Sequence, residues 1–285
     1  MKLARVVLVV GFVLTIGLLL TATAHGVFQS YGVMVIETTT DHPVVVLSFD
    51  TEIGMRDSAV QVLDMLDRQD ISATFFVTGD FIENYPNTTA RLASSRHEFG
   101  SHSYRHPDMT NLTDAEQRFM ITEQKAAAAK YGATPVGFLA PYRQWNGATE
   151  AILREEGFRY DATYYCFNNR ELPTPQVTPH PTSCSRYHWD MPEKGETYLL
   201  EDDFLYGRKN MTSAQVLAVL KDGFDFHAPR GEVVIIAFHP TTRDDRISML
   251  EEFVVYAKAQ GAEFATHEQL EDMLESGQAR LVDGF

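Results

Sequence analysis

The chain is predicted to fold as a single α/β domain built on a parallel sheet, and two observations indicate this. Two continuous runs of mostly β-branched apolar residues, 44–49 and 233–238, have the composition of strands that are buried on both faces. Segments with the apolar spacing of helices alternate with these and other short apolar runs. Such alternation produces parallel strands joined by right-handed crossovers, either in a barrel or in an open doubly wound sheet. The length of 285 residues suits one large domain.

Each expected element has a local signal in the sequence. Short runs of β-branched and aromatic residues predict strands at 44–49, 71–77, 136–139, 233–238 and 263–265. Apolar residues three or four positions apart predict helices at 58–68, over a stretch that ends at 92–96, and at 113–130, 148–156, 212–226 and 247–260. The helix at 113–130 begins with a capping-box pattern, Thr113 with Glu116, and the helix at 148–156 is ended by Gly157. Residues 160–210 are expected to be less regular.

The amino-terminal segment predicts export of the chain. Two basic residues precede an uncharged apolar run over 6–20, and small residues follow it. Residues 1–24 are therefore either a cleaved signal peptide or an uncleaved membrane anchor, and the second case would be the protein's sole contact with a membrane. Residues 25–43 are expected to be a linker and 44–285 the functional domain. Both alternatives predict a protein that is extracellular or at the cell surface.

Asn-X-Ser/Thr triplets and cysteines are consistent with an exported chain. Candidate glycosylation sites occur at Asn87, Asn111 and Asn210. The only two cysteines, Cys166 and Cys184, flank a proline-rich stretch. In an oxidising compartment we expect a disulfide between them, worth ~3 kcal/mol in the chain-entropy model. Two free buried thiols are the alternative.

The net charge of −15 restricts the possible partners. Binding to nucleic acid depends on clustered Lys and Arg, and the sequence contains no such cluster. The acidic surface is expected to keep the protein soluble. Nucleic acid is therefore not an expected partner.

Polar side chains follow the predicted strands at their carboxyl ends. Asp50 and Glu52 follow the first strand, His102 and His106 follow a short apolar stretch, and His239 follows the late buried strand. Ligands bind beyond the carboxyl ends of parallel strands both in barrels and in open sheets. These residues are therefore the candidate site.

The two histidines four residues apart predict a metal site. His102 and His106 can bind one ion if their segment forms a single turn, and Pro107 favours a turn because it disfavours the α conformation at His106. Ser103 stands where zinc proteases have glutamate, which excludes that class. By itself, a histidine pair at this spacing is also common on ordinary polar surfaces. With a carboxylate it forms the open arrangement of catalytic zinc, which also suits cobalt, nickel or iron.

The chain resembles the polysaccharide deacetylase family, carbohydrate esterase family 4. Four segments resemble the family's motifs in the family's order: SFDTE at 48–52, GSHSYRHP at 100–107, FLAPY at 138–142 and IAFHP at 236–240. The resemblance covers most of residues 44–265. It implies a distorted parallel (β/α) barrel with fewer than eight strands. It also implies a metal-dependent hydrolase that removes N-acetyl groups from the amino sugars of an extracellular or cell-surface polysaccharide, so that an acetylated glycan is the expected partner.

The resemblance assigns a role to each motif residue. Asp50 would be the general base, and His102 and His106 would bind zinc or a similar divalent ion. The backbone N–H of Tyr142 would stabilise the oxyanion, and His239 would protonate the departing nitrogen.

Two positions depart from the family's pattern. Thr51 stands where the family has its metal-binding acid, so Glu52 is expected to be the third ligand, with a solvated loop acid as the alternative. Leu139 stands where the family has an arginine that holds the base. Arg143 either replaces that arginine or is an ordinary surface residue.

The acid and tryptophan with which the family positions its catalytic histidine have no clear match. Trp189 with Asp190 is the first candidate, and Asp161 is the second. Two alternative functions also remain open. One is hydrolysis of other linear amides or O-acetyl esters on the same fold, and the other is a catalytically silent carbohydrate-binding relative.

Overall fold

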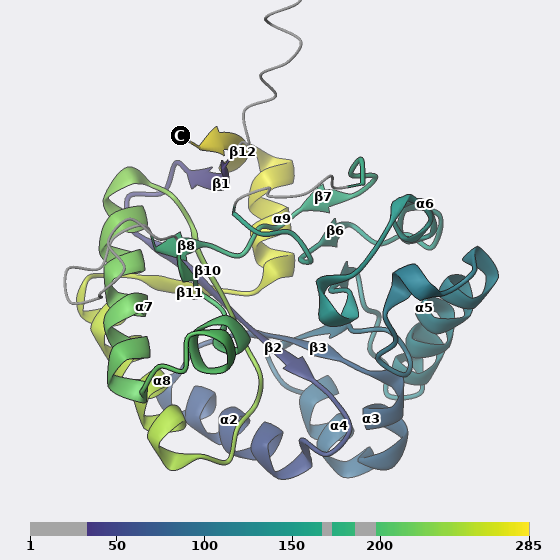
Figure 1. The fold of residues 1–285 in the computed structure, drawn as a ribbon. Helices are drawn as coiled ribbons and strands as arrows, with labels where there is room; N and C mark the ends of the chain where they lie inside the picture. The colour runs from purple at the N-terminus through teal and green to yellow at the C-terminus, as the bar shows by residue number, and fades with distance from the viewer. Residues whose placement is uncertain (1–32, 167–172, 186–197, 285) are drawn as a thin grey trace, which may run out of the picture.

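A curled parallel sheet forms the centre of the computed structural model, which describes residues 33–166, 173–185 and 198–284 (Figure 1). Seven strands follow one another in the order β10-β2-β3-β4-β5-β6-β7, and β11 also pairs with β2. All of these pairings are parallel. The path around the sheet has fewer than eight strands, which confirms the predicted distorted barrel.

The strands are longest where the sequence is most apolar. The strand bounds are β2 (Val44–Thr51), β3 (Thr74–Val77), β4 (Glu98–Ser101), β5 (Gly137–Phe138), β6 (Tyr160–Asp161), β7 (Thr178–Pro179), β10 (Val234–Phe238) and β11 (Glu263–Ala265). Every residue of β2 and β10 is buried, as their continuous apolar runs predict. These two strands pair along five residues, from Val45 with Val234 to Phe49 with Phe238.

Helices cover the outside of the sheet (Figure 1). Their bounds are α2 (Arg56–Gln69), α3 (Gly79–Asn84), α4 (Pro86–Ala93), α5 (Asp114–Ala129), α6 (Gly147–Glu155), α7 (Ser213–His227), α8 (Asp244–Ala259) and α9 (His267–Ser276). The capping box of Thr113 and Glu116 is confirmed. The expected helix end at 92–96 is wrong, because Pro86 starts a separate short helix that ends at Ala93. Helices α3 and α9 were not expected.

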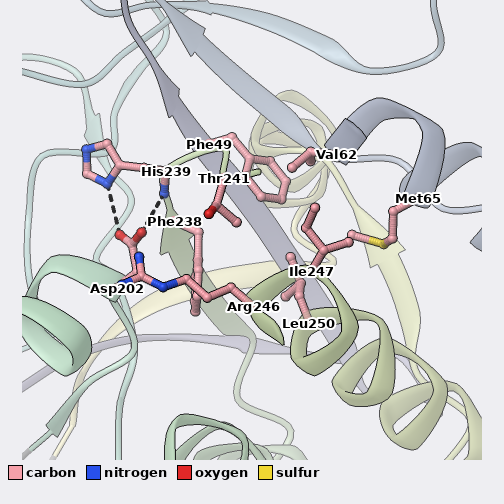
Figure 2. A pocket seen from close by; sticks show the side chains of 10 residues that line it. All are labelled: Phe49, Val62, Met65, Asp202, Phe238, His239, Thr241, Arg246, Ile247 and Leu250. Atoms are coloured by element: carbon pink, nitrogen blue, oxygen red, sulfur yellow. Dashed lines mark hydrogen bonds and ion pairs between the residues drawn. The ribbon is translucent and has the colours of Figure 1, made fainter. Parts of the chain in front are cut away.

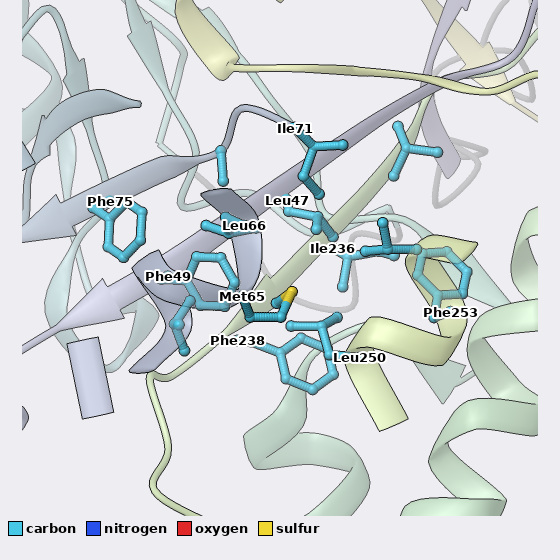
Figure 3. Packing of buried hydrophobic residues seen from close by; sticks show 14 of the residues in the cluster. Leu47, Phe49, Met65, Leu66, Ile71, Phe75, Ile236, Phe238, Leu250 and Phe253 are labelled. Atoms are coloured by element: carbon cyan, nitrogen blue, oxygen red, sulfur yellow. The ribbon is translucent and has the colours of Figure 1, made fainter. Parts of the chain in front are cut away.

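The largest hydrophobic core lies between the sheet and helices α2, α7 and α8. Figure 3 shows side chains of β2 and β10, including Leu47, Phe49 and Phe238, packed against Leu250 and Phe253 of α8. All of these side chains are buried. This packing holds the central strands rigidly and so fixes the positions of the loops that follow them.

Irregular chain closes the barrel between β7 and β10. The N–H of Ser183 donates to the carbonyl of Ile235, and the N–H of Leu200 donates to the carbonyl of Ser183. The segment then runs beside the end of β10, where Glu201 forms a parallel bridge with Ala237. Short strands β8 (Cys184–Ser185) and β9 (Tyr198–Leu199) belong to this closure. The expected irregular region therefore completes the barrel and reaches its carboxyl end.

The ends of the described chain pair with each other. Strand β1 (Val33–Thr38) is antiparallel to β12 (Ala279–Gly284), so the expected linker over 25–43 contains a strand. Val35 and Ile36 are buried there, and this short apolar run is the signal that was overlooked. Residues 1–24 lie outside the described residues. Among those that are described, every helix is too short or too polar to span a bilayer.

The surface modifications expected from the sequence stay predictions. Asn87, Asn111 and Asn210 are all exposed, as glycosylation would require. Cys166 is buried and is disulfide-bonded rather than a free thiol. The side chain of Cys184, the other cysteine of the sequence, lies outside the described residues, so its pairing with Cys166 stays a prediction.

Candidate active site

A wide cleft opens at the carboxyl ends of the barrel strands. It has a volume of about 840 Å³, and its walls include all five polar residues that the sequence places after strands: Asp50, Glu52, His102, His106 and His239. They come from the chain after β2, β4 and β10, which are not adjacent in sequence. The fold therefore brings the predicted residues together.

Two imidazoles converge on one carboxylate oxygen. Oε1 of Glu52 lies 2.9 Å from Nε2 of His106 and 3.8 Å from Nε2 of His102. The three ligand atoms lie within 4.8 Å of one another. Glu52 is therefore part of the cluster rather than a solvated loop acid.

The protonation pattern of the cluster fits a divalent cation. Nδ1 of His102 lies 2.6 Å from the carbonyl oxygen of Leu139. Because a carbonyl only accepts, Nδ1 donates its proton to Leu139, and Nε2 is the ring nitrogen that faces Glu52 and His106. Metal-binding histidines are usually fixed in this way by a carbonyl or carboxylate behind the ring. Two imidazoles, one of them fixed in this way, and a carboxylate form a suitable ligand set for zinc, cobalt, nickel or iron.

The backbone of the histidine segment is a strained turn, as Pro107 predicts. Ser103 and His106 both have left-handed conformations, with φ of 63° and 53°. The hydroxyl of Ser103 accepts a hydrogen bond from the N–H of His106. This turn places the two rings 4.8 Å apart, with His102 buried and His106 at the cleft wall. Left-handed residues outside glycine concentrate at functional sites.

The electrostatics of the cluster keep Glu52 ionised. Burial alone would raise the pKa of its carboxyl, but hydrogen bonding to His102, His106 and His239 outweighs burial and holds the pKa well below its usual range. An ionised carboxylate among imidazoles is the charge state required of a metal ligand.

Asp50 lies beside this cluster at the end of β2. Its side chain is only 6% exposed, and its Oδ1 has no hydrogen-bond partner among the described residues. Buried carboxylate oxygens normally have partners. An atom left without one at the wall of a cleft is available to a ligand or water there.

Arg143 is buried beside Asp50 rather than on the surface. Its Nε lies 3.4 Å from Oε1 of Glu201, and one terminal nitrogen donates to the carbonyl of Ala162. Burial opposes the charged form, but nearby acids, Glu201 first and Asp50 among the others, raise the pKa of Arg143 above its usual value. Arg143 is therefore a buried cation near Asp50, and its ion pair is with Glu201. Leu139 itself packs into a small apolar cluster.

Tyr142 and Arg143 follow β5 in consecutive left-handed conformations, with φ of 55° and 53°. This geometry sends Arg143 inward and leaves the ring of Tyr142 64% exposed. The Tyr142 ring lies edge-on to His106, with ring centroids 4.5 Å apart. Tyr142 thus forms part of the open wall of the cleft.

Asp202 orients His239. Figure 2 shows its carboxylate accepting from the backbone N–H of His239 at 3.0 Å and lying 2.9 Å from the ring Nδ1. Nε2 points toward Glu52, 3.7 Å away. Burial would lower the pKa of His239, but Asp202 above all, with Glu52 and Asp50, raises it well above its usual value. The ring therefore holds a proton in the cleft.

The acid beside His239 is not the one expected from the sequence. Asp161 instead accepts hydrogen bonds from the N–H and hydroxyl of Thr163. Burial, with Glu150 nearby, raises the pKa of Asp161 well above its usual value. Trp189 and Asp190 lie outside the described residues.

Glu201 and Asp202 were missed because their segment has no regular pattern. The available signal was the acidic run at 201–203 directly after three apolar residues, which resembles the end of a strand. Glu201 is buried and accepts a hydrogen bond from the hydroxyl of Tyr165. Burial raises the pKa of Glu201 although Arg143 opposes the shift.

Comparison with known proteins shows a similarity to one family. Residues 37–160 match the family model described as polysaccharide deacetylase. The chain is 30% identical over 124 residues to chitin deacetylase of Colletotrichum lindemuthianum, which covers 41% of this chain and 50% of that one. It is 30% identical over 81 residues to peptidoglycan-N-acetylglucosamine deacetylase of Bacillus cereus, or 28% of this chain and 30% of that one.

The chain is therefore similar to the polysaccharide deacetylase family over residues 37–160, somewhat less than half of its length. The matched segment contains Asp50, Glu52, His102, His106 and Arg143, and it ends before the irregular region. The chain spans half or less of the length of these two curated relatives.

Solved structures show that the family's fold extends over most of the chain. Peptidoglycan deacetylase PdaC of Bacillus subtilis aligns with a TM-score of 0.58 at 21% identity, over 84% of this chain and 94% of that one. A CE4 family pseudoenzyme from Bacillus anthracis aligns with a TM-score of 0.58 at 16% identity, over 81% and 66%. Because active and inactive members share the fold, the activity must be argued from the site.

Proposed function

We propose that this protein is a metal-dependent enzyme that removes N-acetyl groups from amino sugars of a glycan outside the cell or at its surface. One observation carries the proposal. The Nε2 atoms of His102 and His106 converge on Glu52, while Asp50 and a protonated His239 line the same cleft. This is a ligand set with a base and an acid beside it.

The chain's own residues divide the reaction between them. Glu52, His102 and His106 would hold the cation, which when bound polarises the amide carbonyl and lowers the pKa of water. Asp50, with its unpartnered Oδ1, takes the proton of the attacking water. His239 gives its proton to the departing nitrogen, because an amide anion is a very poor leaving group.

Two further groups support this chemistry. Asp202 keeps the His239 ring oriented and charged until the proton is transferred. Arg143 places a buried positive charge near Asp50. The backbone N–H of Tyr142, at the cleft wall, is the proposed donor to the developing oxyanion.

The substrate class rests on the relatives and on the cleft. The relatives compared above are named as chitin and peptidoglycan deacetylases. The cleft, with a volume of about 840 Å³, has room for more than one sugar. Its exposed Tyr142 ring offers a face for a sugar to stack on. The apolar run at 6–20 supports a location outside the cytoplasm.

Acetate release from N-acetylglucosamine oligomers tests the proposal. The purified protein is expected to release acetate, to lose this activity with a chelator, and to regain it with zinc or cobalt. An Asp50→Asn variant is expected to bind one equivalent of metal and release no acetate. Full activity of that variant would show that Asp50 is not the base.

The same assay separates the alternative functions. Release of acetate from O-acetyl esters, or cleavage of linear amides, without acetate release from N-acetylated oligomers would show that the enzyme hydrolyses another type of bond. Glycan binding with no release from any substrate would make the chain a silent relative, as the Bacillus anthracis pseudoenzyme is described to be.

A further inference from the structure

Arg246 is a cation at the cleft wall that the proposed reaction does not use. It lies in the first turns of α8, and Figure 2 shows its side chain extending from that helix toward Asp202 and His239. It lines the main cleft together with His239 and Tyr142. Its guanidinium group is therefore at the edge of the reaction centre.

No carboxylate among the described residues lies within 4 Å of the Arg246 guanidinium. The group instead stacks over the ring of Tyr206, 3.9 Å from its centroid. Its Nε is buried and has no hydrogen-bond partner in the described part of the chain. Three residues earlier, Arg243 is paired with Asp245 at 3.1 Å. In a chain of net charge −15, an arginine at an active site without such a partner is notable.

A second cation faces the same cleft. Arg208, at the end of a short helical segment over Asp203–Arg208, is exposed and lines the cleft. It too has no ion-pair partner within the ranges that the structure describes. Two acids of the cleft have other partners: Asp202 bonds to His239, and Glu201 pairs with Arg143. Asp203, which also lines the cleft, is 77% exposed and lies 4.0 Å from Nδ1 of His239.

The surface continues beyond Arg246 into a neighbouring hollow. This second hollow has a volume of about 380 Å³ and is lined by Tyr206, Asn210, Arg243, Asp245 and Arg246 among others. Arg246 lines both spaces and therefore stands between them. A glycan whose acetamido group is at the reaction centre has room for its next sugar beside Arg246.

We propose that Arg246, with Arg208, forms a subsite for a carboxylate on the sugar next to the N-acetylated one. A planar guanidinium held by an aromatic ring is preorganised for bidentate binding of a carboxylate. The carboxylate belongs either to a uronic acid or to a lactyl ether on an amino sugar. This inference rests on the proposed deacetylase function and specifies its substrate as an acidic glycan.

Matched substrates test the subsite. The first pair is a tetrasaccharide that alternates N-acetylglucosamine with glucuronic acid and the same compound with its carboxyls reduced to alcohols. The second pair alternates N-acetylglucosamine with N-acetylmuramic acid, again intact and carboxyl-reduced. The wild-type protein is expected to show a kcat/KM for acetate release at least about tenfold higher on the acidic member of one pair, since tenfold corresponds to ~1.4 kcal/mol, the size of one charge-assisted hydrogen bond. The pair that shows the preference identifies the source of the carboxylate.

Variants separate recognition from structure. Arg246→Gln is expected to remove the preference mainly through KM and to leave activity on the carboxyl-reduced member within about threefold. Arg246→Lys should restore part of the preference, and Arg243→Gln, on the same turn but already paired, should retain all of it. An unacetylated oligouronate should inhibit the wild type competitively and inhibit Arg246→Gln about tenfold more weakly.

Two results would overturn the inference. One is equal kcat/KM of the wild type on both members of each pair, and the other is an equal loss on both members in a folded Arg246→Gln variant. If instead no N-acetylated glycan releases acetate in the presence of metal, the proposed function itself has failed. The oligouronate binding measured directly by calorimetry then still reports on the subsite.

Discussion

Replacing Asp202 with asparagine isolates the contribution of one carboxylate to catalysis. Asp202 accepts from the N–H of His239 and bonds to its Nδ1 at 2.9 Å, and it is the main cause of the raised pKa of His239. A hydrogen bond between charged groups is worth ~1.5–3 kcal/mol, and each pKa unit corresponds to about 1.4 kcal/mol. Asp202→Asn should therefore lower the pKa of His239 by about one to two units.

The consequence is measurable in the pH dependence of acetate release. If His239 is the general acid, activity falls on the alkaline side as the ring loses its proton, so this limb should move to lower pH by about one to two units. The rate at neutral pH should fall by about a hundredfold, in the range typical for loss of a general acid. Asp203→Asn is the matched control, because Asp203 is 77% exposed and lies 4.0 Å from Nδ1. An alkaline limb that does not move in Asp202→Asn would refute the assignment.

Three further changes test the buried structure. Arg143→Gln should destabilise the fold by ~3–5 kcal/mol in urea unfolding, because it leaves the Glu201 charge buried and unpaired. Adding Glu201→Gln should recover most of this loss. A double variant that recovers none of it would contradict the pairing. Burial raises the pKa of Glu98 to about 7 from its usual 4.5, so the stabilisation from its bound proton is complete below pH 4.5 and is lost as the pH rises through 7. The unfolding free energy of Glu98→Gln, relative to that of the parent, should therefore rise by about 3 kcal/mol from pH 4 to pH 9. If the difference in unfolding free energy between the two proteins is the same at both pH values, this account of Glu98 is wrong. Phe253→Ala should cost ~3–5 kcal/mol of unfolding free energy, and a loss below about 1 kcal/mol would mean that the core in Figure 3 is packed differently.

The central strands and the first half of the site were predictable because their signals are local. The apolar run at 44–49 has the composition of a strand that is buried on both faces, and Asp50 and Glu52 then lie at the carboxyl end of that strand. The turn that contains His102 and His106 is favoured by Pro107, which directly follows His106 in the sequence. Leu139 was identified as the position that lacks the expected cation, and Arg143 was one candidate to replace it, with a surface residue as the alternative.

The second half of the site depends on contacts that are distant in sequence. Asp202 reaches His239 only because its segment lies beside the end of β10, 37 residues away. No periodicity marks that segment, so Asp161 was a reasonable candidate from sequence and was wrong. The strand at Val33–Thr38 also depends on distant contacts, since it pairs with β12 at the other end of the described chain and bonds to the chain around Gly231 and Val233.

The direct test of the central claim is the metal content of the purified protein, measured by elemental analysis with and without the cluster formed by Glu52, His102 and His106. We expect about one equivalent of a divalent transition metal per chain in the wild type. In His106→Ala, with circular dichroism showing an intact fold, we expect less than a tenth of that at the same free metal concentration. A wild-type protein that binds no metal on titration with zinc or cobalt, or a His106→Ala variant that binds it equally well, would contradict the account.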